Sequence, residues 1–403
     1  MRNSLVMVCI AWAATMGAAA ADNAPTPTKE VVVDGLASPW SIAFLNDRQA
    51  LVTEKQGDLL RVDLERGTTA PITGLPSDRV REAAEGTPGD NSGLFDVVLH
   101  PNFADNRLLY LSYAARKGDT RGLKVVRAKL GAAGLADERA ILEATPFTPN
   151  EYHHYGGGLA FGPDGKLYIT VGERVFRESD EPPLPVAQDL TDLRGKVLRL
   201  NDDGSAPQDN PDFGADAVPG LYAVGLRAAQ GITRHPRTGA LWFSEHGSRQ
   251  GDEINLLVRG ANYGWPIRTA GGYRDRDYAP PPLGDEEGRT FTAPAWSFPA
   301  TVAPTGLSFY YGRDFPQWTG DLLVPGLSRG SLWRLRLDGA RIVGATALFP
   351  EDRVRARKVA VSPGGTLYLL TDTLFTVSAE GAMQYAGAPD GQLIRIVPAG
   401  EGR

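Results

Sequence analysis

Short apolar segments recur along the whole chain, and turn residues such as Asn, Asp, Gly and Thr precede most of them. A second apolar segment stands upstream of several copies, at 40–44, 158–161, 231–233 and 358–361. Alternation of apolar and polar residues with a period of two is typical of β-strands. Six repeated units of such strands predict an all-β fold, a six-bladed β-propeller with four-stranded antiparallel blades. The six segments that define the units begin with leucine: 51–54, 108–111, 167–170, 241–244, 322–325 and 367–370.

The two ends of the chain are expected to meet in this ring. The last apolar strand, residues 393–397, is predicted to pair with residues 30–33, because closure removes exposed strand edges. Residues 137–143 are the best short helical candidate, and no longer segment keeps a helical period. Two β-sandwiches in tandem are the alternative architecture. A single propeller over residues 22–403 is favoured because no linker-like stretch divides the chain.

The N-terminal residues 1–21 have the layout of a secretory signal peptide. Arg2 precedes an apolar run over residues 5–16, and small residues follow over 17–21. The run is too short to span a bilayer comfortably. We therefore expect cleavage after Ala21 and an exported protein, periplasmic or secreted, with no membrane span in the mature chain. A membrane anchor that stays uncleaved is the alternative.

Cysteine usage and charge exclude several classes of function. The single cysteine, Cys9, lies inside the predicted signal peptide, so the mature chain has no thiol for a nucleophile, a zinc–thiolate site or an iron–sulfur cluster. The formal net charge is −6 with both signs interspersed and no basic block, which argues against nucleic acid as a partner. The 47 glycines and 30 prolines suit a fold of many strands and turns.

Several ordered stretches resemble the soluble quinoprotein glucose and aldose sugar dehydrogenases. The most specific are residues 35–40, 93–103, 251–256 with 262–266, and 303–306 running on to 315–316, and the resemblance extends from about Gly35 to Val397. It implies a six-bladed propeller that binds pyrroloquinoline quinone (PQQ) and Ca²⁺. It also implies oxidation of an aldose substrate at C1 to the lactone, transfer of electrons to an external acceptor, and a monomer or homodimer.

A histidine pair on a glycine-rich loop is the candidate for proton abstraction. His153 and His154 lie in residues 150–158, and histidine is the usual side chain that takes a proton near neutral pH. The resemblance makes His154 the catalytic base, while His153 stands where the glucose enzymes carry an aspartate. It also makes Arg227 the cation beside the reactive quinone oxygen, where it would stabilise negative charge.

The three carboxylates of the quinone call for arginines, which bind carboxylates in bidentate fashion. Arg355 and Arg357 alternate along a predicted strand, so they share one face. They match the paired arginines of the family. Arg329, beside Ser328, and the hydroxyls of Thr301 and Thr305 are the further expected cofactor contacts. The expected sugar contacts are Asn91, which stands where the family has a glutamine, and Tyr273 on the rim of the funnel.

Calcium binds oxygen ligands, including backbone carbonyls, in loose geometry. The resemblance assigns the catalytic ion to the carbonyls of Gly247 and Ser248, where it would act as a Lewis acid on the quinone. It assigns a second, structural ion to the Glu253 carboxylate and the Tyr263 carbonyl.

Two other functions fit the same architecture, since fold alone does not determine function. One is a non-catalytic propeller binding protein, favoured by Ala228 and Ser328, which stand where the family has asparagine and lysine. The other is a calcium-dependent lactonase or esterase propeller, which needs several acidic and Asn side chains around one calcium; no such cluster is visible at the predicted blade tops. Retention of the candidate base and of the three arginines favours the dehydrogenase.

Overall fold

The computed structural model describes most of the chain, and the statements below refer to that part. The described residues are 25–81, 92–149, 154–175, 178–280, 290–328, 332–351, 355–372, 375–377, 383–385 and 391–399. Four of the predictions above lie outside them: the signal peptide, and the positions of Asn91, His153 and Arg329. Within them, no helix has both the length and the apolar character needed to cross a membrane.

The described chain folds into six small antiparallel sheets and one two-stranded hairpin. The first three sheets comprise β2 (Pro39–Phe44), β3 (Gln49–Glu54), β4 (Leu59–Asp63) and β5 (Thr68–Pro71); β6 (Leu94–Leu99), β7 (Leu108–Lys117), β8 (Thr120–Leu130), β9 (Leu135–Glu143) and β10 (Thr148–Pro149); and β11 (Gly156–Phe161), β12 (Leu167–Val171), β13 (Lys196–Leu200) and β14 (Leu221–Val224).

The other three sheets follow in chain order. They comprise β15 (Ala229–Arg234), β16 (Leu241–Glu245), β17 (Glu253–Leu256) and β18 (Trp296–Ser297); β19 (Ser308–Phe309), β20 (Leu322–Pro325), β21 (Leu332–Asp338) and β22 (Arg341–Ala347); and β23 (Arg355–Val361), β24 (Leu367–Asp372), β27 (Gly391–Pro398) and β1 (Pro27–Leu36). The hairpin is β25 (Phe375–Val377) with β26 (Met383–Tyr385), and the helices are α1 (Phe103–Asn106) and two 3₁₀ turns, Glu178–Asp180 and Pro316–Trp318.

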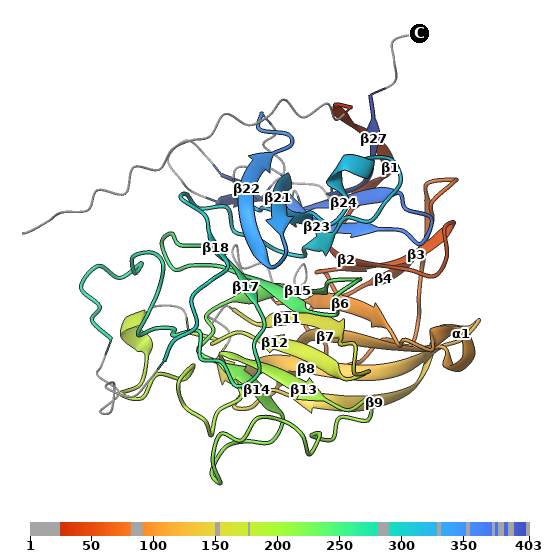
Figure 1. Cartoon of the computed structure of the whole chain (residues 1–403). Coiled ribbons are helices and arrows are strands. Elements are labelled where there is room, and N and C mark those ends of the chain that lie inside the picture. Colours follow the sequence, from red (N-terminus) through yellow and green to blue (C-terminus); the bar gives the residue numbers. More distant parts are fainter. Residues whose placement is uncertain are drawn as a thin grey trace, which may run out of the picture.

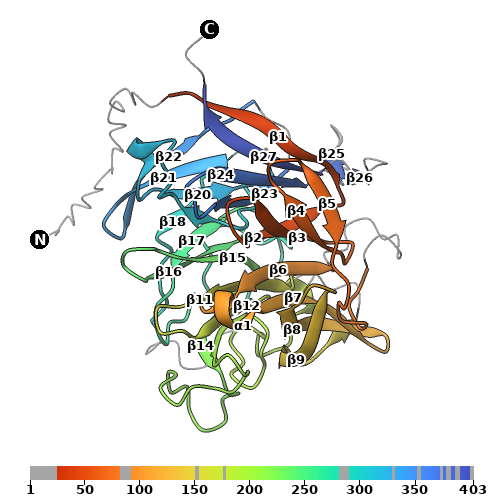
Figure 2. The ribbon, with the colours of Figure 1, turned by 90° about the vertical axis from the view of Figure 1, so that its right-hand side faces the viewer.

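The six sheets form a closed ring, which confirms the predicted six-bladed β-propeller. Each sheet contributes its first strand to the centre, and these strands contact one another in the order β2, β6, β11, β15, β19, β23 and back to β2. Figure 2 shows the sheets following one another around this ring. The side chains between neighbouring sheets are apolar, as where Leu51 and Leu59 of the first sheet pack with Leu94 and Leu109 of the second.

The predicted closure of the ring is also confirmed. In β1, Glu30 lies opposite Arg395 of β27, and Val33 lies opposite Leu393. Arg395 Nη2 is 2.7 Å from Glu30 Oε2 at the exposed side of this pairing. The N-terminal strand therefore completes the blade that the C-terminal strands begin, and no open edge is left at the join.

The helical expectation for residues 137–143 is wrong, because they belong to β9. Val125 of β8 lies opposite Leu142, and Arg127 lies opposite Arg139. Most of β9 is exposed, with Leu135 and Ile141 buried. Pairing with the long β8 strand therefore outweighs the weak local preference of Ala, Glu and Leu for helix.

Because neighbouring strands of each sheet are antiparallel, two kinds of loop lie at the same end of the ring. These are the loops between second and third strands, such as residues 172–195 and 246–252, and the loops between successive sheets, such as 225–228 and 298–307. In Figure 1 the long loops project at the left, and α1, which joins a first strand to a second, lies at the right. The long loops are therefore where a site is built on this scaffold.

Candidate functional site

His154 is held in a constrained position at the start of the third sheet. Its φ of 56° is in the left-handed region, and Gly172 packs directly against its carbonyl group. The residue is buried, with 9% of its surface exposed. Its Nδ1 lies 3.1 Å from Oε1 of Glu173, which stands two residues beyond the end of β12 and which sequence reasoning did not single out. The β11–β12 pairing brings these two loops together.

Glu173 is the centre of this arrangement. Besides His154, its carboxyl group accepts a hydrogen bond from Trp265 Nε1, and its Oε1 lies 3.7 Å from Arg227 Nε. Only 2% of Glu173 is exposed. Burial raises the pKa of Glu173 well above its usual value, and the Arg227 guanidinium opposes that rise. The carboxyl group therefore holds the histidine ring through Nδ1.

Arg227 connects this pair to the candidate calcium loop. Its Nη1 donates to the carbonyl of Gly247 at 2.9 Å, and its guanidinium lies 5.3 Å from the centre of the Trp265 ring. The backbone N–H of Arg227 donates to the Glu245 carboxyl group. A carbonyl oxygen has two lone pairs, so the bond from Arg227 leaves Gly247 able to bind a cation as well.

A second histidine, also missed in the sequence, lies between the arginines. His246 is affected electrostatically by Arg227, Arg357 and Asp252, and burial lowers its pKa to about 4, so the ring is neutral at physiological pH. Its Nε2 lies 3.0 Å from the carbonyl oxygen of Pro304. The sequence could have drawn attention to His246 through its position directly before Gly247, a predicted calcium ligand.

The paired arginines of β23 have different surroundings. Arg357 is buried, its guanidinium lies 4.1 Å from the centre of the Trp40 ring, and its Nη1 donates to Gln230 Oε1 at 2.9 Å. Arg355, at the start of the strand, is half-buried. The hydroxyl of Thr305 donates to the carbonyl of Arg357 at 2.5 Å.

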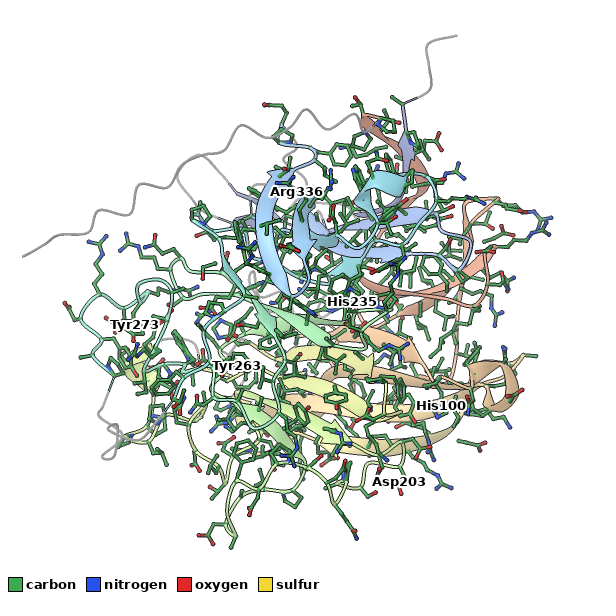
Figure 3. All side chains as sticks on the ribbon, in the orientation of Figure 1. His100, Asp203, His235, Tyr263, Tyr273 and Arg336 are labelled. Atoms are coloured by element: carbon green, nitrogen blue, oxygen red, sulfur yellow. The ribbon has the colours of Figure 1, made fainter. Side chains whose placement is uncertain are left out.

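Two predicted contact residues donate their hydroxyl groups to the backbone. Thr301 Oγ1 donates to the carbonyl of Arg249 at 3.1 Å. Tyr273 donates to the carbonyl of Pro266 at 2.5 Å and packs against Trp265 with ring centres 5.9 Å apart. Figure 3 shows Tyr273 on the projecting loops, on the side of the molecule away from His100 and Asp203.

The predicted calcium ligands gather around one small cavity. Gly247, Glu253 and Tyr263 line a space of about 20 Å³, together with Glu245 and Arg227. That volume holds one water-sized group. Glu245 lies opposite Glu253 across β16 and β17, and burial raises the pKa of both, that of Glu245 to about 8. Ser248 lies beside the cavity, where its hydroxyl is bonded to Glu178.

In the described part of the chain, no three His, Cys, Asp or Glu side chains are grouped so that they could hold a metal ion by themselves. A cation would therefore depend on backbone carbonyls. Asp252 orders that backbone, since its Oδ1 accepts from Gly247 N at 2.9 Å and its Oδ2 accepts from Val302 N at 2.6 Å and Ala303 N at 2.7 Å.

Comparison with known proteins gives the family of the chain. The family model described as glucose/sorbosone dehydrogenase matches residues 36–378. The aldose sugar dehydrogenase YliI of Escherichia coli (strain K12) is 34% identical, over 86% of this chain and 90% of its own. The quinoprotein glucose dehydrogenase B of Acinetobacter calcoaceticus is 30% identical, over 91% of this chain and 90% of its own.

Solved structures of related proteins share the overall fold. The PQQ-bound form of an aldose sugar dehydrogenase from Streptomyces coelicolor superposes with a TM-score of 0.70 at 25% identity, covering 92% of this chain and 99% of that one. The family match spans most of the chain, and the named relatives are sugar dehydrogenases. The chain therefore belongs to the glucose/sorbosone dehydrogenase family.

Proposed function

We propose that this protein oxidises aldose sugars at C1 to the lactone with PQQ and Ca²⁺ and passes the electrons to an external acceptor. The observation that carries the proposal is the buried contact of His154 with Glu173, 3.1 Å long, beside the guanidinium of Arg227. A histidine whose Nδ1 is bound to a carboxyl group is suited to take a proton at Nε2. The quinoprotein and PQQ-bound relatives support the choice of cofactor.

The residues present fit an anionic quinone and a calcium ion. Arg227 Nε is buried, lies 3.7 Å from Glu173 Oε1 and makes no hydrogen bond to the described residues, so the guanidinium brings a positive charge to the site. In this proposal Arg227 lies near the quinone oxygens, and Arg355, Arg357 and Arg329 hold the carboxylates. Thr305 supports the backbone of Arg357, and Thr301 stands close by on the same loop. Gly247 and Ser248 offer carbonyls to the catalytic calcium, and Glu253 and Tyr263 hold the second ion.

When bound, the quinone accepts the hydride and calcium polarises it as a Lewis acid. Side chains of the protein accept the proton of the C1 hydroxyl. His154 Nε2 takes the proton of the C1 hydroxyl, and Glu173 keeps the ring oriented through Nδ1. Trp265 and Arg227 in turn hold Glu173 in place. Asn91 and Tyr273 are the proposed sugar contacts.

Reconstitution tests this function directly. Metal-stripped protein is supplied with PQQ and Ca²⁺, and dye reduction is followed with a panel of aldoses, while quinone binding is measured by calorimetry. His154→Ala should lower kcat by about 10²–10⁴-fold, the contribution of a general base, and leave quinone binding in place. His100→Ala serves as the control, because His100 lies on the side of the molecule away from the loop that carries Tyr273.

The other outcomes are equally informative. Full activity in His154→Ala would remove that residue from the role of base. Quinone binding without turnover of any aldose would point to a different donor. Absence of quinone binding would favour the binding protein or the lactonase.

Residues 1–21 serve as the export signal in this proposal. Expression of the whole chain in a Gram-negative host, followed by N-terminal sequencing of the periplasmic protein, should give a mature start at Asp22. Recovery of the unprocessed chain from the membrane fraction would support the uncleaved anchor instead.

A further inference from the structure

A buried hydroxyl group recurs at the same place in the second strand of several sheets. Thr53 of β3, Ser112 of β7 and Thr170 of β12 are fully buried. The oxygen of each accepts an N–H of the first strand of its own sheet, at 2.9 to 3.0 Å. The pairing of the two strands shifts register at these points. Each hydroxyl therefore binds an N–H group that the β-bulge removes from the regular ladder.

The same hydroxyl groups also donate to the next sheet, and Ser244 of β16 does so as well. Thr53, Ser112, Thr170 and Ser244 donate, in that order, to the carbonyls of Phe95, Gly157, Ala229 and Thr305, at 2.5, 2.5, 2.9 and 2.7 Å. Each acceptor lies in the first strand of the following sheet or in the loop that leads into it. A hydroxyl group therefore links each of the first four sheets to its neighbour, and we call these links the hydroxyl collar.

The hydroxyl collar changes at the fifth sheet. Pro325 is the fourth residue of its leucine-led segment, as Ser244 is of its own, and proline has no hydroxyl group to donate. Thr305, in the loop before β19, supplies one instead, since its Oγ1 donates to the carbonyl of Arg357 at 2.5 Å. The carbonyls of Pro325 and Ala356 lie 3.4 Å from the same oxygen. The hydroxyl link from the fifth sheet to the sixth therefore comes from Thr305.

This link holds β23 at a residue of the candidate quinone site. The carbonyl of Arg357 accepts from the Thr305 hydroxyl and also from the N–H of Gly306 at 3.2 Å. Arg357 is buried, and its guanidinium donates to Gln230 and lies over the Trp40 ring. A side chain packed in this way has little freedom to compensate for a movement of its own backbone. The position of the guanidinium therefore depends on where the loop holds β23.

We propose that Thr305 is a positioning residue for the quinone, which acts through the backbone of Arg357 and completes the hydroxyl collar where Pro325 interrupts it. This inference rests on the proposed function. A side chain of the same shape without a hydroxyl group would turn a methyl group toward three carbonyl oxygens. Because a buried carbonyl that loses its donor is unfavourable, β23 would move away from the loop, and the Arg357 guanidinium would move with it.

Quinone affinity tests this role. Thr305→Val removes the hydroxyl group and keeps the shape, whereas Thr305→Ser keeps the hydroxyl group. In calorimetry on metal-stripped protein resupplied with Ca²⁺, the Kd for PQQ should rise about tenfold in Thr305→Val, because one charge-assisted contact is weakened, and Thr305→Ser should restore it. At saturating PQQ, kcat should stay as in the wild type, because the contact of His154 with Glu173 does not involve this loop.

Thr53→Val is the matched control. Thr53 is also buried and donates at the same distance of 2.5 Å, but its acceptor, Phe95, is not a predicted quinone contact. Both variants should lose stability in urea unfolding, since each leaves a buried carbonyl without a donor, and only Thr305→Val should weaken quinone binding. An equal loss of quinone affinity in the two variants would overturn the inference. Thr305→Ala against Thr53→Ala gives the same comparison if the valine variants do not fold.

Amide hydrogen exchange on the cofactor-free protein tests the link without quinone or turnover. Followed by mass spectrometry, exchange should become faster over Arg355–Val361 in Thr305→Val and over Leu94–Leu99 in Thr53→Val, because each variant loosens one first strand. Unchanged exchange over Arg355–Val361 in Thr305→Val would overturn the inference. A wild-type protein that binds no PQQ would overturn the proposed function instead, while the exchange rates still decide whether Thr305 fixes β23.

Discussion

Gly172 offers a sharp test of how the fold positions the base. It follows β12, and its N–H donates to the carbonyl of Tyr155 at 3.0 Å. A Cβ at this position would lie 1.8 Å from the carbonyl oxygen of His154 and 2.5 Å from its carbonyl carbon. Gly172 does not have a positive φ. The cost of Gly172→Ala is therefore steric and arises from one contact, the backbone of the candidate base.

The size of the displacement follows from the geometry. Real Cβ atoms essentially never approach closer than 3.0 Å, so the new methyl group and the His154 carbonyl must separate from 1.8 Å to at least 3.0 Å. That movement exceeds what the 3.1 Å contact between His154 and Glu173 tolerates. Misplacement of a catalytic group by about 1 Å costs roughly 10²-fold in rate. Overpacking of this kind also costs about 1–3 kcal/mol of stability.

The assay is steady-state dye reduction by the PQQ- and Ca²⁺-reconstituted protein, with urea unfolding measured in parallel. Gly131→Ala is the matched control, because its Cβ would meet only the carbonyl of Gly134 at 3.5 Å, an ordinary contact. We expect kcat of Gly172→Ala to fall by about 10²-fold while the chain remains folded. If both variants kept wild-type kcat, the reasoning that this glycine positions His154 would be refuted.

Trp40→Ala removes the ring that supports Arg357 and packs on Phe95, with ring centres 4.8 Å apart; a buried Trp→Ala change should cost about 3–5 kcal/mol in urea unfolding, and calorimetry should show weaker quinone binding. Unchanged quinone affinity would contradict a cofactor role for Arg357. Glu54, whose carboxylate accepts from Ala37 N–H at 2.6 Å, has its pKa raised by burial to about 7. The native state therefore binds more protons than the unfolded state between about pH 4.5 and 7, and the stability due to this group falls as pH rises through that window. Glu54→Gln should remove that part of the fall, as seen in unfolding free energies measured across the window, and an unaltered pH slope would contradict it.

Local pattern was enough to specify the strands. Each of the six leucine-led segments became the second strand of a sheet, β3, β7, β12, β16, β20 and β24, because alternation and flanking turn residues act over a few neighbouring positions. The one predicted helix is strand β9 in the structure, because pairing with the long strand β8 outweighs the weak local preference for helix. Ring closure was predictable too, since a propeller with unpaired ends would leave two open edges.

The chemistry of the site was decided by tertiary structure. The sequence drew attention to His154 and Arg227 through their motifs, but it did not point to Glu173 or Trp265, because nothing local connects a loop after β12 to a residue 92 positions further on. The hydroxyls of Thr301 and Thr305 read as ligand contacts in the sequence and donate to the backbone in the structure. Hydrogen-bond partners, burial and proton affinity depend on which loops the ring brings together, and that is set by the closure of six sheets around one axis.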